Sequence, residues 1–178
     1  GNFSFINEVF QRCYLGDKNT KNYFNSLVNK EEGQNYSRYI FFYLNYLIEN
    51  NENDEVKRIA NNLDYLNSSL LISQGKKWIE EENLKEFKRI FSCKDSNDIL
   101  GELFFLVANL YSSQGAYDKS NFYLNISNSL NPKFKYNKTL LIENHFQNKN
   151  YAKALKSLKS FDKKDDFYYW FKLKKEAQ

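Results

Sequence analysis

Apolar and polar residues follow a helical period most clearly between Gly101 and Pro132. Over this stretch the residues of one face recur every three or four positions, the spacing typical of an α-helix. Gly115 interrupts the pattern and suits a helix C-cap, and Pro132 ends the second run. The two runs therefore predict a helical hairpin. Their stripes are Phe104, Val107, Ala108 and Tyr111, then Tyr117, Ser120, Leu124, Ser127 and Leu130.

Weaker versions of this hairpin pattern occur before and after it. Their starts fall near residues 4, 37, 68, 101, 135 and 167, which gives steps of 31 to 34 residues. A nearly constant period of this length indicates a helical repeat array. Because each such repeat buries its apolar face against its neighbours, the pattern predicts an all-α solenoid. We expect about five helical hairpins followed by a final helix.

The hairpin at 101 resembles a tetratricopeptide repeat. It departs mildly from the family pattern, since Phe104 stands where tryptophan is usual, and Ser120 and Ser127 stand where alanine is usual. The resemblance implies a right-handed α–α superhelix. The residues that carry it are Phe104, Val107, Ala108, Tyr111, Gly115, Tyr117, Ser120, Leu124, Ser127 and Pro132.

The resemblance also implies how the whole chain is organised. We expect a single domain over residues 1–178, with divergent repeats in 4–100, the clearest repeats in 101–166 and a truncated repeat in 167–178. The pattern is similar to a group of uncharacterised bacterial tetratricopeptide proteins, in which divergent repeats precede a clear one of the LFFLVANLYSSQG type. This similarity supplies no activity, and it implies that the natural protein is longer.

The start of the chain bears on its cellular location. The sequence begins Gly1-Asn2 and contains no Met, so we expect a trimmed segment of a natural protein. An upstream signal peptide would not be visible, and the sequence leaves open the cytoplasm and the bacterial cell envelope. No apolar run approaches the ~18 residues that a membrane-spanning helix needs.

A tetratricopeptide array would line its concave groove with the first helix of each hairpin. Apolar residues recur at matching places and predict an apolar stripe for a bound peptide, namely Phe5, Phe41, Ile72 and Phe105. Asn45 and Asn109 can hydrogen-bond a peptide backbone. The alternative is that these residues widen the core between repeats. We expect a non-catalytic scaffold that binds a peptide or protein partner through Phe41, Asn45, Ile72, Lys76, Phe105, Asn109 and Glu143.

Aromatic residues are abundant, with 16 Phe, 14 Tyr and 2 Trp, and five of them are consecutive in 167–171. One neighbouring helix cannot cover all five, because they surround the helix axis. The block therefore predicts a homo-oligomer through the C-terminal helix, with Phe167, Trp170 and Phe171 in the contact.

The residues that carry chemistry are few and scattered. His145 is the only histidine, and it falls on a core-facing stripe rather than beside a nucleophile. Cys13 and Cys93 are 80 residues apart, which is no metal-ligand spacing, and we interpret both as helical core positions. We interpret the acidic runs 80–82 and 165–166 as solvated helix ends. The sequence therefore predicts no catalytic residue, no cofactor and no metal, and an enzyme based on His145 is the weakest alternative.

Positive charge is concentrated towards the C-terminus. The net charge is +4, and residues 133–178 hold 12 basic and 5 acidic residues. This asymmetry supports the runner-up function, nucleic-acid binding. A solvated lysine-rich helix face explains the same residues more simply, so the sequence disfavours nucleic acid as a partner. The lysines concerned are Lys153, Lys156, Lys159, Lys163 and Lys164.

Overall fold

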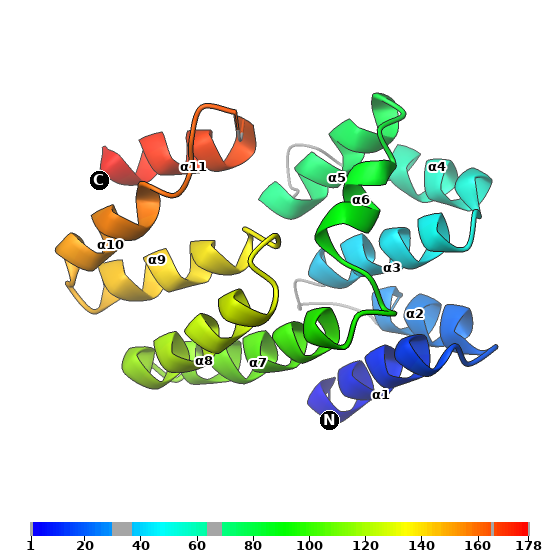
Figure 1. The fold of residues 1–178 in the computed structure, drawn as a ribbon, viewed down its shortest axis with the longest axis horizontal. Helices are drawn as coiled ribbons and strands as arrows, with labels where there is room; N and C mark the ends of the chain where they lie inside the picture. The colour runs from blue at the N-terminus through cyan, green and yellow to red at the C-terminus, as the bar shows by residue number, and fades with distance from the viewer. Residues whose placement is uncertain (1, 30–36, 64–68, 165, 178) are drawn as a thin grey trace. The chain divides into compact units, whose positions relative to one another are not determined.

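The structure is a computed structural model that describes residues 2–29, 37–63, 69–164 and 166–177. Within these residues it consists of eleven α-helices and contains no strand (Figure 1). The predicted all-α class is therefore confirmed. The chain divides into two compact units, Gly1–Ile99 and Leu100–Gln178, here named the N-terminal and C-terminal units.

In its described residues the N-terminal unit contains six complete helices, and the long helix α7 begins at its end. Helix α3 contacts four others, α2, α4, α5 and α6, and lies in the middle of the unit (Figure 1). The helices are α1 Asn2–Leu15, α2 Thr20–Val28, α3 Ser37–Glu49, α4 Asn53–Asn61, α5 Leu70–Glu80, α6 Lys85–Ile90 and α7 Ser96–Ser113.

Phenylalanine rings fill the core around α3. The ring centroids of Phe42 and Phe91 are 4.5 Å apart, and those of Phe41 and Phe87 are 5.0 Å apart. Phe10 of α1 meets Phe42 edge-on at 5.1 Å. All five side chains are buried. Such contacts add to the free energy of burial, so the high aromatic content of this half of the chain serves its core.

A disulfide bond joins the two ends of the N-terminal unit. Cys13 of α1 and Cys93, which follows α6, have Cα atoms 5.6 Å apart. Both side chains are buried, but Cys13 lies in a helix whereas Cys93 lies in a turn, so the interpretation as helical core positions holds for Cys13 and is wrong for Cys93. Their pairing was not predicted, because a spacing of 80 residues gives no sign that α1 returns to the segment after α6.

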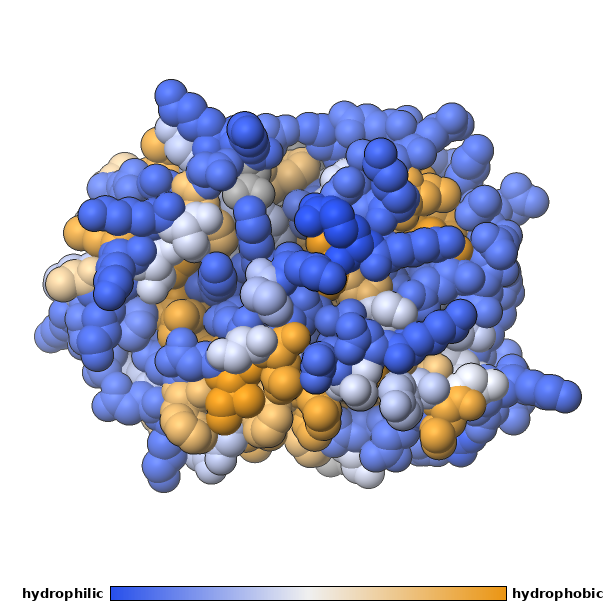
Figure 2. Space-filling model, in the orientation of Figure 1, coloured by the Kyte–Doolittle hydropathy of each residue, from blue (hydrophilic) through white to orange (hydrophobic). Residues whose placement is uncertain are grey.

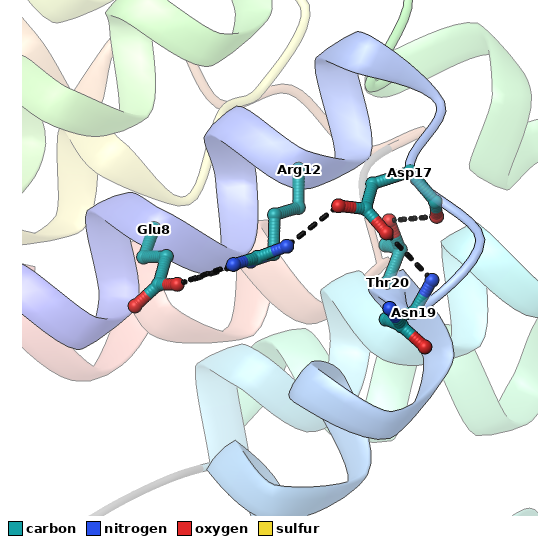
Figure 3. Close-up of polar contacts among 5 residues, drawn as sticks. All are labelled: Glu8, Arg12, Asp17, Asn19 and Thr20. Carbon is teal, nitrogen blue, oxygen red and sulfur yellow. Dashed lines mark hydrogen bonds and ion pairs between the residues drawn. The ribbon is translucent and has the colours of Figure 1, made fainter.

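An arginine-centred contact holds the turn between α1 and α2 (Figure 3). Arg12 Nη2 lies 2.8 Å from Glu8 Oε1, and Arg12 Nη1 lies 2.6 Å from Asp17 Oδ2. Asp17 Oδ1 also accepts a hydrogen bond of 2.7 Å from the backbone N–H of Asn19. These donors stabilise the carboxylate, and they lower the pKa of Asp17, the N–H of Asn19 being the largest cause and Arg12 a further one.

The C-terminal unit consists of most of α7 and four further helices. These are α8 Tyr117–Leu130, α9 Asn137–Gln147, α10 Tyr151–Leu158 and α11 Asp166–Glu176. Small polar side chains lie between its helices. Ser127 Oγ donates to the carbonyl oxygen of Gly101 at 2.7 Å, and Asn137 Nδ2 donates to Ser127 Oγ at 2.8 Å. Ser127 Oγ thus both donates and accepts a hydrogen bond at this close contact.

Among the described residues, the same turn recurs at five helix ends. In each turn, one residue has a positive φ, between 54° and 73°. The residue after it donates its N–H to the carbonyl oxygen of the residue five positions before the donor, at 2.8–3.0 Å. This is the Schellman geometry of a helix C-terminus. It occurs at intervals of 31 to 35 residues and joins the first ten helices into five hairpins. The left-handed residues are Gly16, Asn51, Glu82, Gly115 and Lys149.

Candidate functional site

Four of the seven predicted groove residues lie inside the two units. Phe41, Asn45 and Ile72 are buried in the N-terminal unit, and Phe105 is buried in the C-terminal unit. Their burial favours the alternative in which such residues widen the core, since a partner has no access to them in this structure.

Asn45 already uses its amide within the protein. Its Nδ2 donates to the carbonyl oxygens of Phe87 and Phe91, at 2.8 and 3.0 Å. Phe87 lies in α6 and Phe91 directly follows it, and the Phe87 carbonyl also accepts a hydrogen bond of 3.2 Å from the N–H of Phe91. Asn45 therefore caps α6 from α3, and its amide donor is engaged there rather than available to a peptide backbone.

The other three predicted groove residues are accessible. Lys76 is half-buried, and its Nζ donates to the carbonyl oxygen of Leu63 at 2.9 Å. Asn109 is exposed on α7. Glu143 of α9 is half-buried and lines a cavity.

That cavity is the candidate site, and it belongs wholly to the C-terminal unit. Its volume is about 520 Å³, within the range of small binding pockets. Two large apolar side chains at it remain exposed, Tyr151 by 55% and Leu155 by 44%. It is lined by Glu143, Phe146, Gln147, Tyr151, Leu155, Lys175 and Glu176.

The turn between α9 and α10 positions the aromatic wall of the cavity. Lys149 adopts φ 55°, and the N–H of Asn150 donates to the carbonyl oxygen of His145 at 2.8 Å. Asn150 then caps α10, because its side chain accepts a hydrogen bond from the N–H of Lys153. Tyr151 is thereby fixed as the first residue of α10, with its ring edge-on to Phe146 at 5.9 Å.

Helix α11 supplies the cationic group of the cavity. Tyr168 and Phe171 are buried against Phe161, with ring centroids 5.2 and 6.2 Å away, and they anchor the helix. Lys175, one turn after Phe171, places Nζ 2.8 Å from Glu143 Oε1 and 5.5 Å from the ring centre of Phe146. Its side chain is only 13% exposed.

The cavity places an apolar surface beside a charged pair. Phe146, Tyr151 and Leu155 offer apolar surface to one side chain of a partner. The ion pair of Glu143 and Lys175 offers an acceptor and a donor beside that surface, which can bind a peptide N–H and C=O.

His145 of α9 lies next to the side-chain amide of Asn121. It is half-buried, and its Nδ1 lies 3.4 Å from Nδ2 of Asn121. Burial is the main cause that lowers the pKa of His145, and the charge of Lys153 lowers it further. Among the described residues, no group of three or more His, Cys, Asp or Glu is placed to hold a metal ion.

The residues predicted for self-association lie in three different environments. Phe171 is buried in the C-terminal unit, Phe167 is half-buried, and Trp170 is 56% exposed. Lys174 Nζ lies 5.3 Å from the ring centre of Trp170. The exposed side of α11 is thus smaller and more basic than the run of five aromatics suggested.

The lysines predicted for nucleic-acid binding are all exposed, on α10 and in the loop that follows it. They are Lys153, Lys156, Lys159, Lys163 and Lys164. None of them lines the candidate cavity.

Tyr151, Leu155 and Lys175 were not predicted as site residues. A sequence signal exists for Leu155, because it falls just off the buried stripe of Ala154 and Leu158 on α10.

No described helix is both long and apolar enough to cross a membrane. Compared with protein-family models, curated proteins and solved structures, the chain matches none.

Proposed function

We propose that the chain is a non-catalytic interaction scaffold that binds a peptide segment of a protein partner in the cavity of the C-terminal unit. The observation that carries this proposal is the exposure of Tyr151 and Leu155 beside the ion pair of Glu143 and Lys175. Exposed apolar side chains next to placed polar groups are typical of recognition sites.

The proposal includes a tetratricopeptide-like α-solenoid. Its support is the turn that recurs every 31 to 35 residues and joins the helices in pairs. Repeats of this kind are quasi-one-dimensional and commonly present an extended surface to a partner.

Selection from a displayed library of random peptides tests the proposal. We expect selected peptides to bind the chain, and Tyr151→Ala and Leu155→Ala to weaken binding on the order of tenfold, as for anchor residues of an interface. The matched control is Leu173→Ala, since Leu173 is similarly exposed on α11 but does not line the cavity. An equal loss of peptide affinity in the control, or an unchanged peptide affinity in the cavity variants, would contradict the proposal.

A second candidate, single-stranded nucleic-acid binding, rests on the exposure of the five lysines of α10 and the following loop. Its test is the binding of an oligouridylate at increasing salt concentration. Binding through these lysines requires affinity that falls steeply with salt, and a shallower slope after Lys156→Gln and Lys159→Gln. A salt-independent result would leave the peptide scaffold as the better proposal.

A further inference from the structure

The hairpin of α7 and α8 contains unusually few charged residues. Between Leu100 and Asn131 only Glu102, Asp118 and Lys119 are charged, which is 3 of 32 residues, whereas 48 of 178 are charged in the whole chain. Glu102 is buried, so within residues 100–131 the charged side chains that reach the surface are Asp118 and Lys119. Depletion of charge combined with aromatic residues is characteristic of the core of a protein–protein interface.

Large apolar side chains of the hairpin are exposed. Phe122 of α8 is 62% exposed and Leu110 of α7 is 53% exposed, and Leu100 is exposed at the start of the hairpin. Figure 2 shows hydrophobic side chains gathered over α7 and α8. Large exposed apolar side chains gathered in one region mark interaction sites.

The rings of this face support one another. Tyr123 stacks on Tyr111 with centroids 5.6 Å apart and rings parallel within 1°, and on Phe104 at 6.2 Å. Phe122 meets Tyr123 edge-on at 5.3 Å. Because these rings already contact one another in the unbound chain, binding a partner needs less ordering of side chains, which favours association.

A hollow of about 430 Å³ lies directly beside the protruding Phe122. It is lined by Tyr111, Asp118, Lys119, Phe122 and Tyr123. Lys119 Nζ lies 5.6 Å from the ring centre of Tyr111, and the charge of Asp118 offsets that of Lys119. The face therefore carries a protruding ring, a hollow and no net charge.

We propose that this face binds the same face of a second copy of the chain, with Phe122 of each copy inserted into the hollow of the other. A two-fold contact requires a surface that complements itself, and a projection next to a hollow meets that requirement. The exposed side of α11 fits a second copy less well, because Trp170 carries Lys174 beside it and two such faces would bring lysines together.

Analytical ultracentrifugation of the 178-residue chain over an about hundredfold concentration range tests the proposal. We expect the mass to rise from 21.3 kDa towards twice that value. Phe122→Glu should raise the dissociation constant on the order of tenfold or more, since a central aromatic anchor is lost. The matched control Trp170→Glu should leave that constant unchanged, because Trp170 is almost as exposed as Phe122 but lies on α11.

Salt provides an independent readout. Because the face holds one charge of each sign, the dissociation constant should change little between low and high salt, whereas contact through the lysine-flanked α11 should respond to screening. A strict monomer at every concentration would overturn the proposal. So would loss of association in Trp170→Glu but not in Phe122→Glu, and an unchanged thermal unfolding of both variants shows that neither result comes from misfolding.

Discussion

Asp17 shows how one carboxylate in a turn links stability to pH. Its pKa is lowered in the folded chain, first by the N–H of Asn19 and then by Arg12. The unfolded chain therefore binds more protons near and below pH ~4, where a free Asp titrates. The stability that this carboxylate contributes is present above that pH and is lost as the pH falls through the folded pKa.

We therefore expect the urea midpoint of the wild type to fall on acidification below about pH 4 more steeply than that of Asp17→Asn. Circular dichroism at a series of pH values measures both midpoints. If the two curves are parallel, the hydrogen bonds around Asp17 do not stabilise the carboxylate form.

Two helical glycines predict opposite effects of the same substitution. A Cβ at Gly75 would lie 3.1 Å from Phe87 Cζ and 3.2 Å from Phe41 Cδ2, and both of those rings are fully buried. A Cβ at Gly101 would have its nearest neighbour, the Ser127 carbonyl oxygen, at 3.4 Å. Alanine is favoured over glycine within a helix by about 1 kcal/mol, so the contacts decide the sign.

Gly75→Ala should lower the free energy of unfolding by about 1–2 kcal/mol, because the overpacked rings cannot move away. Gly101→Ala should raise it by up to about 1 kcal/mol. Urea unfolding followed by circular dichroism compares the two. A stabilising Gly75→Ala would mean that the rings of Phe41 and Phe87 can yield.

At the scale of helices and turns, the recurring left-handed residue predicts a further stabilising change. Lys149 joins α9 to α10 with φ 55°, a conformation that costs a non-glycine residue about 1–2 kcal/mol. Lys149→Gly should therefore raise the melting temperature of the C-terminal unit. The control is Lys153→Gly, which places glycine inside α10 and should lower it. Destabilisation by both changes would argue against the turn geometry.

The disulfide between α1 and the segment after α6 predicts a loss of stability on reduction. A cross-link between residues 80 apart lowers the conformational entropy of the unfolded chain, which raises the free energy of unfolding by about 4 kcal/mol. Reduction, or Cys13→Ser with Cys93→Ser, should thus destabilise the N-terminal unit strongly. Urea unfolding with and without a reductant measures this effect. Two free thiols in the denatured, unreduced chain would show instead that the bond does not form.

The helices themselves follow from the period of apolar residues, but the width of their buried faces does not. Helix α3 is buried on nearly all sides because four other helices contact it, so Phe41 and Asn45 lie inside rather than along a groove. A stripe in a sequence shows which side is apolar, and only the packing of neighbours decides how far burial extends around the helix.

The cavity of the C-terminal unit is completed by α11, a helix that comes later in the sequence than α9 and α10 and is joined to α10 by a loop. Glu143 was predicted from its place on α9, but Lys175 reaches it only because Phe171 anchors α11.

Three of the five hairpin turns have Asn, Glu or Lys where glycine is usual, so they lack the residue that makes such turns recognisable in a sequence.

At the scale of the whole molecule, the two proposed surfaces of the C-terminal unit should act together without sharing residues. The cavity is lined by α9, α10 and α11, whereas the self-association face lies on α7 and α8. A dimer through α7 and α8 would therefore present two free cavities. Because a second binding event in such a dimer is intramolecular, a ligand with two peptide copies should bind more tightly than one with a single copy.

We expect two selected peptides joined by a flexible linker to bind about tenfold or more tightly than the same linker with one peptide scrambled, at a linker length that spans both cavities. Fluorescence anisotropy over a series of linker lengths measures this ratio. Phe122→Glu should bring the ratio close to one while leaving the affinity for the single peptide unchanged, since Phe122 does not line the cavity. Tyr151→Ala should weaken both ligands and leave the dimer intact. If Phe122→Glu also weakened the single peptide, the two surfaces would not be separate, and the cavity would depend on the dimer.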